Sequence, residues 1–210
     1  MVDKKTIHII GDSHSRIFGY FKSCRIIWLG AITMHHFKAN KEDLVYEKYK
    51  IPYEDIIISS CGEIDVRCHV GRQRDKYHRQ LSEILDELVK YYIIAVAQNC
   101  NNYKFLGIKS ISPPNKQPNT RREYKSFPFY GSLLDRIRIT KMLNKRLKNA
   151  CQNNNLLYLD TYTLLCDNRG VLKYKYSDGH VHLNPKNRRC MYILKKRINN
   201  LRNSVKITSI

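Results

Sequence analysis

Short apolar segments recur along the chain, and their length and their content of β-branched residues favour buried strands. The segments are Thr6–Ile10, Arg25–Leu29, Asp55–Ser59, Lys104–Ile111 and Leu156–Asp160. Helix-periodic stretches lie between most of them, and strands that alternate with helices form a parallel sheet covered on both faces. The pattern therefore predicts a three-layer α/β/α sandwich with a mostly parallel five-stranded sheet, built as a single domain over residues 1–210.

Three longer stretches repeat apolar residues at the spacing of a helix that packs one face on a sheet. The clearest runs from about Arg74 to Val96, and a second runs from about Ser132 to Asn153. The last is expected to open at Asn184-Pro185, because proline is tolerated at the start of a helix, where its missing amide costs no hydrogen bond.

Prolines interrupt the segment between Ser112 and Ser132 and exclude a long regular element there. Long loops at the carboxyl edge of a parallel sheet often carry binding residues. We expect an extended loop whose aromatic side chains either line a substrate site or pack in the core. These side chains are Tyr124, Phe127, Phe129 and Tyr130.

The formal net charge of +20 favours an anionic partner such as nucleic acid, a virion interior or a phosphorylated surface. The abundance of Lys, Asn, Ile and Tyr weakens this inference, because A/T-rich coding produces the same bias without selection for binding. No acidic residue follows Asp178, so the basic C-terminal helix is the expected docking face for an anionic partner. Its outward cations are Arg188, Arg189, Lys195, Lys196 and Arg202.

The seven cysteines are scattered and have no Cys-x-x-Cys spacing, which indicates reduced thiols and neither a disulfide framework nor a zinc site. His35-His36, Cys68-His69 and His180/His182 fit no recognised metal spacing, so we expect no metal and no cofactor. The N-terminus lacks the apolar region of a signal peptide, and no apolar run approaches the ~20 residues of a membrane span. We therefore expect an intracellular, cytoplasmic protein, which for a viral chain means the host cytoplasm or the virion.

The run Gly11-Asp12-Ser13-His14-Ser15 directly follows the first predicted strand. A parallel strand delivers its last residues to the carboxyl edge of the sheet, where the free amides of the next helix favour negative charge. A hydroxyl at this turn is well placed to act as a serine nucleophile. The same residues can equally act as helix caps, because Asp and Ser side chains accept hydrogen bonds from the first amides of a helix.

Four segments, in order along most of the chain, resemble the motif blocks of the SGNH, or GDSL-type, esterase and lipase superfamily. They are Gly11-Asp12-Ser13, Gly30, Gly62-Glu63-Ile64-Asp65 and Asp178-Gly179-His180-Val181-His182-Leu183-Asn184. The resemblance implies a flavodoxin-like fold with Ser13 as nucleophile, His182 as base and Asp178 as the acid that orients it. A serine hydroxyl is a poor nucleophile until an imidazole in a fixed tautomer takes its proton. These three residue types are therefore the ones that such a reaction needs.

The last block departs from the family's Asp-x-x-His spacing, because Asp178 is followed by His180 and His182. We prefer His182 as the base, since His-Leu-Asn before a helix is the typical ending of the block and a one-residue bulge absorbs the difference. His180 stays open as the alternative base.

The third block departs more seriously, because Ile64 stands where the family has an Asn that donates to the oxyanion. Two backbone donors remain, the amides of Ser13 and Gly30, and loss of one donor in a hydrolase costs ~10²–10³ in rate. Reduced activity, a substitute donor such as Arg67 and an absence of catalysis all stay open. Gly62 is expected to shape the site.

Charged residues flank Ile64 in the sequence. Glu63, Asp65 and Arg67 form an acidic-basic cluster, which we interpret as a salt-bridged loop that holds the shape of the site. Asp12 is expected to support the turn that carries the serine and to take no part in the chemistry.

The leading prediction is a serine hydrolase that cleaves a carboxylic ester through an acyl-enzyme on Ser13. A small acyl ester or an O-acetylated carbohydrate is favoured over a long-chain lipid, because the candidate loop is polar and basic between its aromatic residues. One alternative is a weak or inactive SGNH-like protein that binds an anionic glycan or nucleic acid. Another is O-acyl transfer to a sugar hydroxyl by the same residues. The sequence leaves the oligomeric state undetermined.

Overall fold

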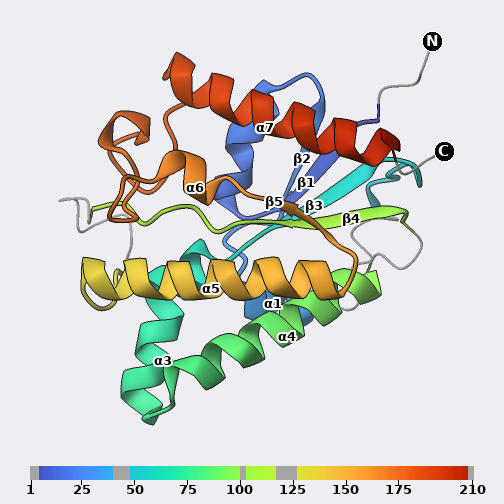
Figure 1. The fold of residues 1–210 in the computed structure, drawn as a ribbon. Helices are drawn as coiled ribbons and strands as arrows, with labels where there is room; N and C mark the ends of the chain where they lie inside the picture. Colours follow the sequence, from blue (N-terminus) through green and yellow to red (C-terminus); the bar gives the residue numbers. More distant parts are fainter. Residues whose placement is uncertain (1–4, 40–47, 100–102, 117–126, 208–210) are drawn as a thin grey trace.

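Five strands form one sheet in the order β2-β1-β3-β4-β5, and every pairing in it is parallel (Figure 1). The structure is a computed structural model that describes residues 5–39, 48–99, 103–116 and 127–207. The strands are β1 Ile7–Gly11, β2 Cys24–Trp28, β3 Ile56–Ser60, β4 Phe105–Lys109 and β5 Leu157–Leu159. They lie where the apolar segments predict them, and the predicted three-layer α/β/α sandwich is confirmed.

Helices cover both faces of the sheet (Figure 1). Each face has its own hydrophobic core. One face is covered by α1 Met34–Ala39, α3 Val70–Tyr77, α4 Leu81–Asn99 and α5 Leu133–Asn153. The other is covered by the 3-10 helix η1 Ser13–Tyr20, α6 Tyr162–Leu165, the 3-10 turn η3 Tyr174–Tyr176 and α7 Arg188–Ile207. The central strands β1 and β3 are buried along their whole length, which explains their nearly continuous apolar sequence.

The strand register brings three of the motif blocks to one edge of the sheet. Gly11, at the end of β1, pairs with Trp28 of β2 on one side and with Ser60 of β3 on the other. Because these parallel strands end side by side, the residues that follow them meet at the carboxyl edge. Position 11 requires glycine, since a Cβ there would lie 1.9 Å from the carbonyl oxygen of Ser60.

The predicted helix from Arg74 to Val96 is wrong in one respect, because the structure has two helices there. Between α3 and α4, His78 takes a left-handed conformation with a φ of 51°. A residue in this conformation does not continue a right-handed helix. The break falls in a polar stretch, 78–80, where no apolar side chain needs burial. α3 itself directly follows a π-helical turn, η2 Asp65–His69.

The other two long helices begin at side-chain caps. α5 begins as predicted, directly after Ser132, whose hydroxyl accepts a hydrogen bond from the amide of Asp135 at 3.0 Å in a capping box. The predicted start of α7 at Pro185 is wrong. That helix begins at Arg188, because the side chain of Asn187 accepts a hydrogen bond from the amide of Cys190 at 2.9 Å.

The proline-rich loop is described only at its two ends. Residues 117–126 lie outside the described residues, and Tyr124 is among them. Phe129 packs on the guanidinium groups of Arg67 and Arg136, whose Cζ atoms lie 5.3 and 4.9 Å from its ring centroid. This aromatic side chain therefore stacks on buried cations.

The described cysteines are all free thiols, and Cys100 lies outside the described residues. Burial raises the pKa of Cys151 to about 12 and that of Cys190 to about 11, so both thiols are protonated at neutral pH. None of the helices in the described ranges has the length and apolar character needed to cross a membrane.

Candidate active site

Ser13 opens the 3-10 helix η1 just beyond the end of β1. Asp12 caps this helix, because its Oδ1 accepts a hydrogen bond from the amide of His14 at 2.9 Å. The amide of Asp12 donates to the carbonyl oxygen of Ser60 at 3.1 Å, which ties the turn to β3. Since Asp12 performs the capping, the hydroxyl of Ser13 is left for another partner.

That partner is His182. Its Nε2 lies 2.9 Å from Oγ of Ser13, and its Nδ1 lies 3.5 Å from Oδ2 of Asp178. The hydroxyl, the imidazole and the carboxylate therefore stand in the order that a Ser-His-Asp triad requires, with the carboxylate at the longer distance.

The turn that carries His182 is organised by Asp178, whose Oδ1 accepts hydrogen bonds from the amides of His180 at 2.8 Å and His182 at 3.2 Å. Gly179 has a φ of 90°, a left-handed conformation that favours glycine. The ring of His182 lies against Ser13, whereas the carbonyl of His180 accepts a hydrogen bond from the side chain of Asn115.

Two further motif glycines follow the neighbouring strands. Gly30 comes after β2 with a φ of 83°, and Gly62 comes after β3 with a φ of 116°. A Cβ on Gly62 would lie 2.7 Å from Cδ1 of Ile111, so this position has no room for a side chain. Both glycines thus carry backbone at the same sheet edge as Ser13.

The position of the family's Asn carries no polar side chain, because Ile64 is apolar and 4% exposed. The guanidinium of Arg67 donates to Oε1 of Glu63 at 2.8 Å and to the carbonyl oxygen of Phe127. Arg67, in the π-helical turn η2, is therefore held by Glu63 four residues earlier and by the end of the proline-rich loop.

No family model matches the chain, and no curated protein matches it. Several solved structures, however, are similar to this chain in fold. A Bacteroides fragilis protein described as an acylhydrolase is 15% identical with a TM-score of 0.62, over 98% of this chain and 90% of that one. A GDSL-like lipase from Bacteroides thetaiotaomicron is 15% identical with a TM-score of 0.58, over 97% and 91%. A variant of an acetyl xylan esterase from Geobacillus stearothermophilus is 17% identical with a TM-score of 0.55, over 94% of each chain. The chain has the SGNH-hydrolase fold.

A second histidine lies beside Ser13 and His182. The ring centroid of His14 lies 4.9 Å from that of His182. Burial and the charge of His14 lower the pKa of His182 to about 4, although Asp178 and Glu63 act in the opposite direction. The imidazole of His182 is therefore unprotonated at neutral pH and able to accept a proton.

His14 belongs to a buried ionic cluster with Glu63 and Arg67. Its Nε2 lies 3.4 Å from one carboxylate oxygen of Glu63, while Arg67 donates to the other. Burial by itself would raise the pKa of Glu63, but the hydrogen bond and charge of His14, together with Arg67, lower it to about 2. Sequence reasoning missed His14, although its place directly after Ser13 was a signal that it lies at the same sheet edge.

Ser13 and His182 open onto a hollow of about 250 Å³. Its other walls come from η1 and from the turn before α7. They are His14, Arg16, Ile17, Tyr20, Leu183 and Pro185. A hollow of this size has room for a short acyl group and part of its alcohol.

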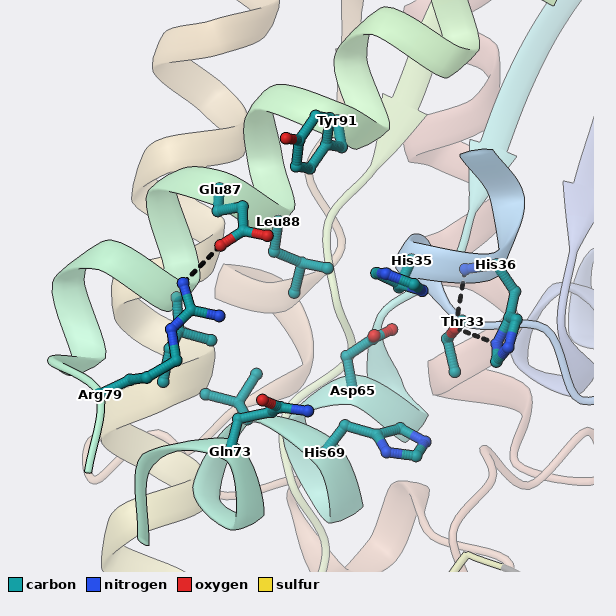
Figure 2. Close-up of a pocket in the computed structure, with 12 residues that line it drawn as sticks. Thr33, His35, His36, Asp65, His69, Gln73, Arg79, Glu87, Leu88 and Tyr91 are labelled. Atoms are coloured by element: carbon teal, nitrogen blue, oxygen red, sulfur yellow. Dashed lines mark hydrogen bonds and ion pairs between the residues drawn. The ribbon is translucent and has the colours of Figure 1, made fainter. Parts of the chain in front are cut away.

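A second hollow of about 250 Å³ lies among α1, α3 and α4 of the SGNH fold (Figure 2). Asp65 reaches into it from η2, and His35, His36 and His69 also line it. Oδ2 of Asp65 accepts a hydrogen bond from the amide of Met34 at 2.9 Å, and burial raises the pKa of this carboxyl to about 7. Among the described residues, no group of three or more His, Cys, Asp or Glu side chains is arranged to hold a metal.

Proposed function

We propose that the protein is a serine esterase that hydrolyses small acyl esters, O-acetylated carbohydrates above all, through an acyl-enzyme on Ser13. The observation that carries the proposal is the 2.9 Å contact between Oγ of Ser13 and Nε2 of His182. Asp178 supports it from the other ring nitrogen, at 3.5 Å.

In the first half-reaction, Oγ of Ser13 attacks the ester carbonyl carbon while Nε2 of His182 takes the hydroxyl proton. The tetrahedral intermediate collapses, the C–O bond to the alcohol breaks, and His182 returns the proton to the leaving alkoxide. In the second half-reaction water attacks the acyl-enzyme with the same proton transfers, which releases the acid and restores Ser13. Asp178 keeps the proton on Nδ1 and stabilises the imidazolium.

The negative charge of the tetrahedral intermediate is assigned to two backbone donors, the amides of Ser13 and Gly30. Ile64 adds no third donor, and loss of one oxyanion donor typically lowers kcat by ~10²–10³. We therefore expect a slow esterase. Arg67 and Gly62 are assigned to shaping the site, because Arg67 already donates to Glu63.

The substrate class rests on two supports. The hollow at Ser13 is about 250 Å³, which suits a short acyl group better than a long chain. Structural neighbours of the chain include acetyl xylan esterases. A free sugar hydroxyl that attacks the acyl-enzyme in place of water would turn the same steps into O-acyl transfer.

The test is ester turnover with p-nitrophenyl acetate and an acetylated xylo-oligosaccharide. We expect Ser13→Ala and His182→Ala each to lose at least about 10³-fold in kcat/KM. His180→Ala is the matched control, and it should stay within a few-fold of wild type. Equal turnover by wild type and Ser13→Ala would contradict the proposal, and loss in His180→Ala instead of His182→Ala would reassign the base.

A second candidate function is favoured by Ile64, which removes a side-chain donor from the oxyanion site. It is a catalytically weak or inactive protein that binds an anionic glycan or nucleic acid through the exposed cations of α7. Such binding weakens steeply as salt rises, because phosphate contacts release counterions. Salt-dependent binding in a protein without ester turnover would favour this candidate.

A further inference from the structure

The rim of the hollow at Ser13 carries an exposed cation. Arg16 lies three residues after Ser13 in the 3-10 helix η1, where residues i and i+3 lie on the same side of the helix. It is exposed, and it lines the same hollow as Ser13 and His182. At a rise of about 2 Å per residue, three residues correspond to about 6 Å along the helix. A group held by Arg16 is thus one sugar unit away from an ester at Ser13.

Trp28 holds this cation in place. It stands at the end of β2, paired in register with Gly11, and its side chain is 57% exposed. Cζ of Arg16 lies 5.5 Å from the centroid of the Trp28 ring, within the range of a cation–π interaction. The contact restrains this surface arginine beside the hollow.

Arg16 has no carboxylate partner among the described residues. The acids around Ser13 and His182 are engaged with other groups, since Asp12 accepts a hydrogen bond from the amide of His14, Glu63 pairs with His14 and Arg67, and Asp178 lies at His182. Tyr20, which is 66% exposed, lines the same hollow and adds an aromatic wall. The rim therefore combines exposed aromatic surface with a positioned guanidinium that forms no ion pair with a carboxylate of the described residues.

We infer that the alcohol part of the substrate carries an anionic group and that Arg16 binds this group while the ester lies at Ser13. The inference deepens the proposed function and rests on it. A guanidinium presents a planar pair of N–H donors that matches a carboxylate or a phosphate. Arg16 therefore favours an ester whose alcohol part carries one of these anions. The anion comes either from a sugar acid or from a phosphorylated alcohol.

The test compares esters that differ only in charge. One pair is acetylated glucuronic acid and its uncharged amide, and the other is acetylated glycerol phosphate and acetylated glycerol. We expect kcat/KM to be about tenfold higher for the charged member of at least one pair, and the preferred pair identifies the source of the anion. The preference should shrink as salt rises, because Arg16 is exposed.

Arg16→Gln should reduce the ratio of kcat/KM between the charged and the uncharged member of the preferred pair to about one. Arg138→Gln is the matched control, because it removes the same charge from an exposed position on α5, on the opposite face of the sheet. That control should keep the wild-type preference. Trp28→Leu should lower the preference and Trp28→Phe should retain it, since only the latter keeps a ring for the guanidinium.

Equal kcat/KM for both members of each pair in wild type would overturn the inference while leaving the esterase proposal intact. A preference that persists in Arg16→Gln would also overturn it. Binding of the charged and uncharged compounds to Ser13→Ala separates the two proposals. Selective binding of the acid together with no turnover by wild type would refute the esterase and support recognition of the anion by Arg16.

Discussion

Two carboxylate–imidazole pairs lie side by side in this molecule, and they differ in burial more than in geometry. Asp178 and His182 lie 3.5 Å apart with side chains 26% and 39% exposed, while Glu63 and His14 lie 3.4 Å apart with side chains 15% and 5% exposed. The first pair faces a hydroxyl and a hollow. The second is tied to Arg67, and His14 borders the same hollow with a side chain that is almost fully buried. The comparison teaches that pairing with a carboxylate does not distinguish the two histidines, whereas the 2.9 Å contact with the Ser13 hydroxyl belongs to His182.

The largest effect is expected from Asp178→Asn, which removes the carboxylate from the Asp178–His182 pair. Without the carboxylate the imidazole of His182 loses its preferred tautomer, so kcat/KM for p-nitrophenyl acetate should fall by about 10³-fold. Thermal unfolding should change little, because this aspartate is partly exposed. Activity within a few-fold of wild type would show that the 3.5 Å contact has no orienting role.

Glu63→Gln breaks the buried pair and should affect stability more than rate. The pKa of Glu63 is lowered from 4.5 to about 2, so its ionised form contributes about 3 kcal/mol above pH 4.5. That contribution is lost as pH falls from 4.5 towards 2. Urea unfolding of wild type and variant should therefore show a gap of about 3 kcal/mol at pH 7 that narrows at low pH. A gap that stays the same at every pH would contradict this assignment.

The smallest effect is expected from His14→Gln, which removes the charge beside His182. In the proposed mechanism His182 accepts a proton only when it is unprotonated, so we expect activity to fall as pH drops through the pKa of His182, at about 4. Removal of His14 should raise this pKa and move the acid limb of the kcat/KM profile by about one pH unit towards neutrality. His36→Gln, at the second hollow, is the control and should leave the limb in place. An unmoved limb in His14→Gln would show that His14 has no electrostatic effect on the base.

The strands of the sheet were predictable because each one is encoded by a local run of apolar residues. β1 and β3 are short apolar runs that are buried on both faces, and such runs are visible in one sequence. The carboxyl-edge placement of Ser13 followed from the same reasoning. The break at His78 was not predictable in the same way, since the apolar spacing on either side of it fits one continuous helix.

The ionic cluster behind Ser13 and His182 depends on contacts that no local pattern encodes. His14 and Glu63 meet because β1 and β3 are neighbours in the sheet, as the pairing of Gly11 with Ser60 shows. Sequence analysis grouped Glu63, Asp65 and Arg67 in a salt-bridged loop. The structure has the Glu63–Arg67 ion pair at 2.8 Å, but the segment is helical, and Asp65 accepts from the amide of Met34 and lines the second hollow. The sequence offered no means of placing Trp28 beside Arg16, because strand order is a property of the whole sheet.

The contact of Gly11 with Ser60 also bears on how this molecule can evolve. The position of Ser13 is fixed by main-chain packing at a place where even one added carbon atom would lie 1.9 Å from the Ser60 oxygen. Arg16, Tyr20 and Trp28 are exposed and belong to neither hydrophobic core. Substitutions at these three rim positions can therefore accumulate under selection for new substrates. In the turn that bears Ser13, by contrast, few substitutions are tolerated.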